Sequence, residues 1–219
     1  MRKITFPPVE TANEDGIVAV GGDLEIDTLI TAYRHGIFPW PISIDLPLAW
    51  FSPDPRGILH LEEIHISKSF QKFLKKNKFK VTYNLEFQRV IELCAKTNRK
   101  NQSSTWITPE IIEGYVQMFN SGYAYSVEVW NDDELIAGLY GVCLGNFISG
   151  ESMFTSEDNA SKYALFCLIE KLKNKGIRWM DTQMVTPVVE SFGGRYISRP
   201  EFLQKISEIN WARERNEIF

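Results

Sequence analysis

The chain has 219 residues, a formal net charge of −4, 44% hydrophobic residues and 24% charged residues. These values are ordinary for a soluble globular protein, and the acidic balance argues against a general nucleic-acid coat protein. The sequence contains no run of about 18 apolar residues and no apolar stretch next to Met1. We therefore expect neither a transmembrane helix nor a secretory signal.

The cysteines indicate a reducing compartment. They are far apart and odd in number, which is typical of reduced thiols in a cytoplasmic protein: Cys94, Cys143 and Cys167. The three histidines show no metal-binding spacing with these cysteines. We therefore expect no structural zinc.

The first 60 residues are rich in proline and glycine and predict a small N-terminal domain, followed by a larger domain at residues 61–219. A helix is expected at residues 26–35, with Gly36 as its stop. Residues 38–56 carry several prolines and little periodicity, so we predict an ordered loop there. Trp40 and Trp50 lie in this loop. Each either packs onto a core or presents its ring to a ligand, and packing is favoured for Trp40.

A basic segment follows the N-terminal domain. Residues 64–85 contain six lysines and no acidic residue. A helix capped by Ser67 would turn Phe70 and Phe73 inward. Its outer face would then carry Lys68, Lys72, Lys75 and Lys76. Such a face is either simply solvated or contacts phosphate groups, and the pattern alone leaves both readings open.

Helices and strands alternate in the rest of the chain. Strands are expected at residues 80–83, 124–130 and 134–143, with the last two joined as a hairpin. Helices are expected near residues 85–96, 109–120 and 199–209. An antiparallel run that leads into a βαβ unit predicts an α+β fold with a mixed sheet.

The βαβ unit carries a small set of polar residues. Residues 146–151 indicate one strand, residues 163–172 a buried helix, and residues 177–183 a second strand. Asp181 and Gln183 should share a face of the second strand, with Glu151 close by if the two strands are neighbours. Carboxylates beside apolar sequence indicate either catalysis or a buried polar cluster that fixes packing. Both interpretations stay open at this point.

Several short strings together resemble the leucyl/phenylalanyl-tRNA–protein transferase family. The βαβ unit supplies GESMF at 150–154, NASK at 159–162 and DTQ at 181–183. Upstream, in the same order as in the family, stand GGDL at 21–24, YRHGIFPW at 33–40, WFSPDPR at 50–56, TWIT at 105–108, SVEVW at 126–130 and GLYGV at 138–142. The resemblance covers the chain from Phe6 to about Ile206.

The resemblance implies a fold and an activity. The larger domain would be acetyltransferase-like (GNAT-like), with a mixed β-sheet. The reaction would move Leu or Phe, and less readily Met, from aminoacyl-tRNA to the N-terminal α-amine of proteins that begin with Arg or Lys. The new N-terminal residue can mark the protein for degradation. No cofactor or metal is implied, and we expect a cytoplasmic monomer without a membrane partner.

The resemblance also implies roles for particular residues. Asp181 would act as base or charge anchor, Gln183 would orient the incoming amine, and Glu151 would hold a cationic amine. The tRNA would be bound by Trp50, Trp106, Lys68, Lys72, Lys75 and Lys76. The aminoacyl side chain would enter a pocket formed by Leu139, Ile148, Met153, Leu165, Leu168, Leu172 and Met180.

The chain departs from the family pattern in two places. Val188 stands where relatives often carry a His, which puts any role of that His in doubt. Leu168 and Leu172 are aliphatic where some relatives have aromatic residues, which bears on the choice between Leu and Phe.

Two rival functions remain. A coenzyme A-dependent N-acetyltransferase would share the fold, but it needs a Gly-rich loop that leads into a helix and binds pyrophosphate. Gly193 and Gly194 are followed instead by a strand-like stretch at residues 195–197. A non-enzymatic RNA-binding module would account for the lysines and tryptophans, but not for the polar trio at Glu151, Asp181 and Gln183.

Overall fold

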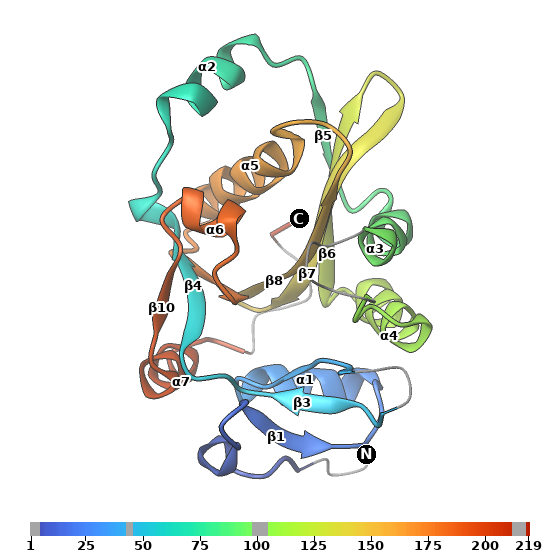
Figure 1. Ribbon diagram of the computed structural model, residues 1–219, viewed down its shortest axis with the longest axis vertical. Coiled ribbons are helices and arrows are strands. Elements are labelled where there is room, and N and C mark those ends of the chain that lie inside the picture. The colour runs from blue at the N-terminus through green and yellow to red at the C-terminus, as the bar shows by residue number, and fades with distance from the viewer. Residues whose placement is uncertain (1–4, 43–45, 98–104, 212–217) are drawn as a thin grey trace.

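The structure is a computed structural model that describes residues 5–42, 46–97, 105–211 and 218–219. Within these residues the strands form two sheets (Figure 1). A small sheet has three strands in the order β1-β3-β2, and a large sheet has seven in the order β10-β4-β9-β8-β7-β6-β5.

The small sheet lies in the N-terminal part of the chain. It contains β1 (Ile17–Val20), β2 (Phe38–Pro39) and β3 (Ala49–Phe51), with α1 (Ile26–Arg34) between β1 and β2 and the 3-10 helix η1 (Val9–Thr11) before them. β3 pairs antiparallel with both β1 and β2. The prediction of a loop over residues 38–56 was therefore wrong in part, and residues 43–45 lie outside the described chain. These strands are too short, and too often interrupted by proline, to show a period of two.

The large sheet is mixed, as predicted. Its strands are β4 (Arg56–His60), β5 (Lys80–Tyr83), β6 (Ala124–Asn131), β7 (Glu134–Leu144), β8 (Phe147–Thr155), β9 (Trp179–Gln183) and β10 (Arg195–Ile197). β8 and β9 are parallel, while the other neighbours are antiparallel. The predicted α+β fold with a mixed sheet is confirmed.

Helices cover both faces of the large sheet. Figure 1 shows α5 (Ala160–Asn174) and α6 (Pro187–Ser191) on one side of β6 to β8, and α3 (Phe87–Lys96) and α4 (Pro109–Asn120) on the other. α2 (Lys68–Lys76) lies at the end of the molecule opposite the small sheet, at the top of Figure 1. The 3-10 helix η2 (Leu61–Glu63) follows β4, and α7 (Arg199–Ser207) follows β10.

Local chemistry explains several helix starts. Ser67 Oγ accepts from the Phe70 backbone N–H at 3.2 Å, which confirms the predicted cap of α2. Thr108 caps α4 in the same way, with a proline in its first turn. Asn159 precedes α5 in the left-handed region and gives no side-chain cap.

The hydrophobic core is divided by the large sheet. One cluster joins α1, α3 and α4 to one face, and it contains Leu29, Ile91 and Ile111. The other joins α5 to the opposite face through Leu165, Leu168 and neighbouring residues. Since β4 belongs to the large sheet, residues 56–60 pair with the second half of the chain, and the division at residue 60 stays a prediction. None of the helices in the described chain combines the length and apolar character that a membrane span requires.

Candidate active site

β8 and β9 separate from each other next to the predicted catalytic residues. Within the described chain, Ser149 and Asp181 form the one residue pair between these two parallel strands. On the other side of β8, Ser152 pairs with Tyr140 and Gly150 with Gly141, so Glu151 is the extra residue of a β-bulge. Bulges redirect side chains and are frequent beside active sites. The bulge thus turns Glu151 toward the gap between the strands.

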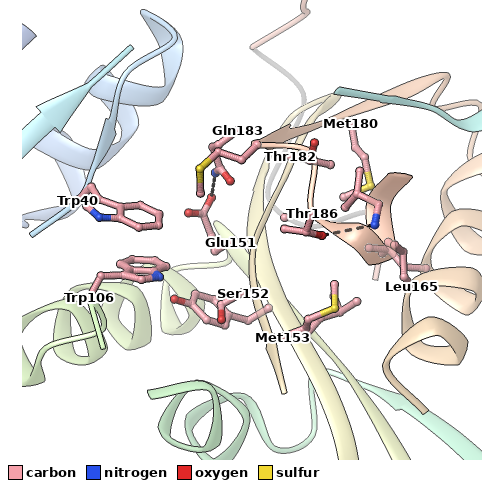
Figure 2. A pocket seen from close by; sticks show the side chains of 16 residues that line it. Trp40, Trp106, Glu151, Ser152, Met153, Leu165, Met180, Thr182, Gln183 and Thr186 are labelled. Atoms are coloured by element: carbon pink, nitrogen blue, oxygen red, sulfur yellow. Dashed lines mark hydrogen bonds between the residues drawn. The ribbon is translucent and has the colours of Figure 1, made fainter. Parts of the chain in front are cut away.

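A cavity of about 240 Å³ occupies this gap. Figure 2 shows Trp40 and Trp106 at one end, Glu151 and Gln183 near them, and Met153, Leu165 and Met180 at the other end. The cavity therefore has an apolar end on the α5 side of the sheet and a polar end toward the N-terminal part. Across the described residues, no group of three or more His, Cys, Asp or Glu side chains is arranged to hold a metal ion.

Most of the predicted aminoacyl-pocket residues line this cavity: Leu139, Met153, Leu165, Leu168 and Met180. Ile148 and Leu172 do not, and this is a correction. Ile148 pairs with Cys143 before β8 and β9 part, and its side chain is 1% exposed. Leu172 lies one helical turn beyond Leu168 and is buried in the same core cluster. Both residues belong to the hydrophobic core on the α5 side of the sheet.

A strained turn at the end of β9 positions Gln183. Its φ is +52°, a conformation that non-glycine residues seldom adopt. Asp181 Oδ1 accepts from the Gln183 backbone N–H at 2.9 Å and holds this turn. Gly57, the partner of Gln183 on β4, allows it, since a Cβ there would come within 2.7 Å of the Met184 backbone. Such strain is often found at functional sites.

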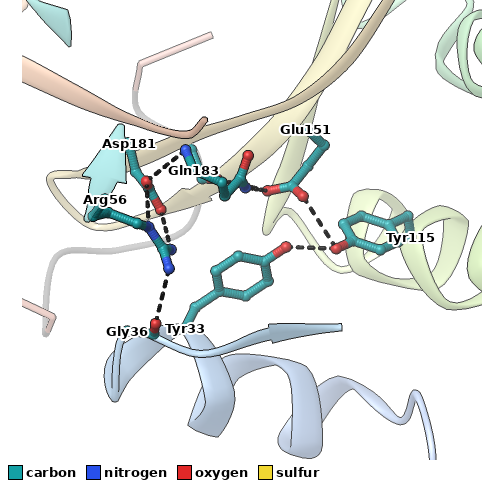
Figure 3. A network of polar contacts seen from close by, with 8 residues as sticks. Tyr33, Gly36, Arg56, Tyr115, Glu151, Asp181 and Gln183 are labelled. Carbon is teal, nitrogen blue, oxygen red and sulfur yellow. Dashed lines mark hydrogen bonds and ion pairs between the residues drawn. The ribbon is translucent and has the colours of Figure 1, made fainter. Parts of the chain in front are cut away.

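Glu151 lies in a buried hydrogen-bond network (Figure 3). Its Oε1 accepts from Gln183 Nε2 at 3.0 Å and from Ser149 Oγ at 2.6 Å. Its Oε2 accepts from the Tyr115 hydroxyl at 3.4 Å, and this hydroxyl lies 2.5 Å from the hydroxyl of Tyr33. Gln183 Nε2 also donates to Ser149 Oγ at 2.9 Å. Because the amide nitrogen is committed to these two acceptors, the amide oxygen of Gln183 is left for a ligand.

Asp181 is held by an arginine that sequence reasoning did not assign to the site. Arg56 Nε donates to Asp181 Oδ1 at 2.9 Å, and its Nη2 donates to Oδ2 at 2.6 Å. Arg56 Nη1 donates to the Gly36 carbonyl oxygen at 3.1 Å. The guanidinium also lies over the rings of Phe38 and Phe202, at 4.7 and 4.4 Å from their centroids. Both charged groups are buried, at 1% and 0% exposure. Asp181 thus stands behind Gln183 and is not among the residues that line the cavity.

Burial sets the protonation of this network. It raises the pKa of Glu151 to about 7, against hydrogen bonds from Ser149 and Gln183 that lower it, and the Asp181 carboxylate adds to the rise. Burial, together with the charge of Glu151, raises the pKa of both tyrosine hydroxyls well above the usual value. Tyr33 and Tyr115 therefore stay neutral donors, whereas Glu151 changes charge near neutral pH.

The raised pKa of Glu151 predicts a pH-dependent stability. Between its ordinary value of 4.5 and about 7, the folded protein holds a proton that the unfolded chain has released. The free energy of unfolding should therefore fall as pH rises through this window, by at most about 1.4 kcal/mol per pH unit from this group. Urea unfolding at several pH values should show a shallower fall in Glu151→Gln than in the wild type. Parallel pH profiles in the two proteins would contradict the assignment.

Trp50 lies away from the cavity, against the prediction that it binds tRNA, whereas Trp40 packs against the core as favoured. Trp50 is 1% exposed, donates from Nε1 to the Gly21 carbonyl oxygen at 2.8 Å, and packs edge-on against Phe6. The Trp50 ring therefore lacks the free face that stacking on a base requires, which corrects its predicted role in tRNA binding. Trp40 instead lines the cavity, stacked on Trp106 with ring centroids 4.8 Å apart and planes 16° apart. The loop that carries Trp50 pairs as β3, which turns its side chain into the core.

The α2 lysines and Val188 lie outside the cavity. All four lysines of α2 are exposed, on the face opposite the buried Phe70: Lys68, Lys72, Lys75 and Lys76. Val188 is half-buried against the α5-side core and is not among the residues that line the cavity, although its neighbour Val189 is. The side chain at this position therefore faces away from the site in this chain.

Comparison with known proteins shows which family the chain matches. Residues 58–207 match the family described as "Leucyl/phenylalanyl-tRNA protein transferase", and residues 22–54 match the N-terminal domain of that description. A protein of Pseudomonas fluorescens named "Leucyl/phenylalanyl-tRNA--protein transferase" is 45% identical over 201 residues, which cover 91% of this chain and 88% of that protein. A protein of the same name from Christiangramia forsetii is 46% identical over 201 residues, covering 91% and 94%.

One solved structure resembles the chain weakly. The structure described as "The structure of L-PGS from Bacillus licheniformis" has a TM-score of 0.40 and 15% identity, and covers 73% of this chain and 52% of that one. A likeness at this level says nothing about activity.

Proposed function

The chain belongs to the leucyl/phenylalanyl-tRNA–protein transferase family and is an aminoacyltransferase, and from this premise we propose its substrates and the roles of its residues. It transfers Leu or Phe, and less readily Met, from aminoacyl-tRNA to the N-terminal α-amine of proteins that begin with Arg or Lys. The new N-terminal residue marks the acceptor for degradation. The observation that supports this most is the two-ended cavity, in which an apolar pocket adjoins the Glu151–Gln183 pair.

The apolar end of the cavity suits the side chain of the donor. It is lined by Leu139, Met153, Leu165 and Met180. An apolar pocket discriminates by only about 1–3 kcal/mol per methylene group, so related side chains such as that of Met should be accepted at a lower rate. The flexible methionines in the wall adapt to donors of different shape.

The polar end suits two amines. The acceptor α-amine has a pKa near 8, so a fraction is already neutral near neutral pH, and positioning supplies much of the rate. The amide oxygen of Gln183 accepts a hydrogen bond from this amine and so orients the lone pair of the amine toward the ester carbonyl. Glu151, when ionised, holds a cationic amine. Asp181 acts as a positioning residue through its bond to the Gln183 backbone.

The stacked pair of Trp40 and Trp106 suits the terminal adenosine of the tRNA. Base–aromatic stacking contributes about 1–3 kcal/mol per base and needs no sequence readout. The position of this pair at the polar end of the cavity would place the ribose ester between the base and the catalytic residues.

A mass-spectrometric assay tests the proposed reaction. Purified protein is mixed with Leu-tRNA or Phe-tRNA and with a peptide that begins with Arg, beside a matched peptide that begins with Ala. A gain of one leucyl or phenylalanyl residue on the Arg peptide alone supports both the donor and the acceptor rule. Equal modification of both peptides contradicts the acceptor rule, and an absence of product with intact ester contradicts the proposed donors.

The α2 lysines give a quantitative prediction for tRNA binding. Replacing Lys75 and Lys76 with Gln should weaken tRNA affinity at low salt and flatten its salt dependence. Each lost phosphate contact should reduce the slope of log K against log salt by about 0.7–0.9, because fewer counterions are released on binding. Affinity is measured between low and moderate salt with labelled tRNA.

The matched control replaces two exposed lysines near the end of α5, Lys173 and Lys175, with Gln. It removes the same charge, so it accounts for any effect of net charge alone. Equal losses in the two double variants would show that α2 has no specific contact with the tRNA.

A further inference from the structure

Thr182 has a buried hydroxyl without a hydrogen-bond partner. The residue stands between Asp181 and Gln183 on β9 and is 9% exposed. Its Oγ1 has no partner among the described residues, although the hydroxyls of Ser149 and Tyr115 nearby are both satisfied. A buried hydroxyl left unpaired costs free energy, so such groups are rare and call for an explanation.

The place of Thr182 in the cavity suggests what its partner is. Thr182 lines the cavity, and Figure 2 shows it between Gln183 at the polar end and Met180 at the apolar end. A donor whose side chain fills the apolar end, and whose ribose lies toward Trp40, has its ester carbonyl at this junction. This step rests on the proposed function.

The reacting carbonyl needs a hydrogen-bond donor that the rest of the polar network does not offer. Gln183 Nε2 is committed to Ser149 and Glu151, and the Ser149 hydroxyl donates to Glu151. These groups supply acceptors for amines. When the amine attacks, negative charge develops on the carbonyl oxygen, and a donor already in place stabilises it most.

We propose that the Thr182 hydroxyl donates a hydrogen bond to the carbonyl oxygen of the aminoacyl ester and to the oxyanion that this oxygen becomes. The amine lone pair forms the new C–N bond while the carbonyl π pair moves onto oxygen. Collapse of the intermediate breaks the C–O bond to the ribose, and the proton lost by the amine ends on the ribose oxygen. Thr182 keeps its own proton throughout.

The test compares Thr182→Val with Thr182→Ser. Val matches the shape of Thr without a hydroxyl, and Ser keeps the hydroxyl. With enzyme in excess, the single-turnover rate of peptide formation should fall on the order of 100-fold in Thr182→Val and stay within about threefold in Thr182→Ser. The affinity for aminoacyl-tRNA should change less than about threefold, and Thr182→Val should melt no lower than the wild type, since it removes an unpaired buried hydroxyl.

The outcomes separate this inference from the proposed function. An active wild type with an equally fast Thr182→Val overturns the role of the hydroxyl alone. A loss of affinity with an unchanged rate also overturns it, because the bond would then be made to the ground state. An inactive wild type overturns both proposals. If Thr182→Val does not fold, Thr182→Ala against Thr182→Ser gives the same comparison.

Discussion

Replacing Arg56 with Met is expected to lower the free energy of unfolding by about 3–5 kcal/mol, since it leaves the Asp181 carboxylate buried without its partner. Arg56 donates two hydrogen bonds to this carboxylate, at 2.9 and 2.6 Å, and neither residue is more than 1% exposed. It also joins three parts of the chain, through the Gly36 carbonyl oxygen, the β9 carboxylate and the Phe202 ring on α7. Urea unfolding followed by tryptophan fluorescence measures the loss.

A double variant separates the structural role of this pair from its role in catalysis. Arg56→Met with Asp181→Leu should regain much of the lost stability, because apolar residues often replace a buried ion pair at little cost. Activity should not return, because the Gln183 backbone would still lack the Asp181 oxygen that holds its turn. The control is Arg195→Met, which breaks an exposed ion pair with Glu63 and should leave stability unchanged. A small loss in Arg56→Met, equal to that of the control, would show that the buried pair contributes little.

Local pattern was enough to predict the βαβ unit and the central trio. The apolar helix at α5 and the polar strand ends at Glu151 and Gln183 lie within about 35 residues, so short-range periodicity and strand alternation apply. The parallel pairing of β8 and β9 then brings the trio together as predicted. The bulge that turns Glu151 inward depends on Gly141 across the strand pair, where a Cβ would collide with the Ser149 carbonyl oxygen.

Residues that reach the site from far along the chain escaped the prediction. Tyr33 on α1 and Tyr115 on α4 meet near Glu151, and Arg56 on β4 meets Asp181 across 125 positions of sequence. No local period connects such residues, since their meeting depends on tertiary packing. One signal was present, because Tyr33 and Arg56 both lie in strings that resemble the family.

The places of Trp40 and Trp50 also depend on tertiary packing and could not be predicted from the local sequence. Trp40 and Trp50 stand in one proline-rich stretch, and nothing in the stretch distinguishes them. Strand pairing decides which of the two side chains is enclosed. β3 lies between β1 and β2, so Trp50 is enclosed, whereas Trp40 follows the end of β2 and meets Trp106 at the polar end of the cavity.

Replacing Gln183 with Leu is expected to lower the single-turnover rate of peptide formation by about 100- to 1,000-fold. The amide of Gln183 makes two bonds, to Glu151 and Ser149, and these leave its oxygen aimed at the cavity. A leucine of similar size cannot orient an amine, and misplacing a reacting group by about 1 Å can cost about 100-fold in rate. The rate is measured with enzyme in excess over Leu-tRNA or Phe-tRNA and with saturating Arg peptide.

The affinity for aminoacyl-tRNA should change little in this variant, because Gln183 acts on the incoming amine while the tryptophans and the apolar end bind the donor. Gln88→Leu is the control, since Gln88 is exposed on α3 and, among the described residues, bonds only to Glu92 one turn away. A variant with weak binding but a normal rate at saturation would place Gln183 in donor binding. A Gln183→Leu protein as fast as Gln88→Leu would show that the amine needs no hydrogen bond from this position, and that the turn held by Asp181 serves the fold alone.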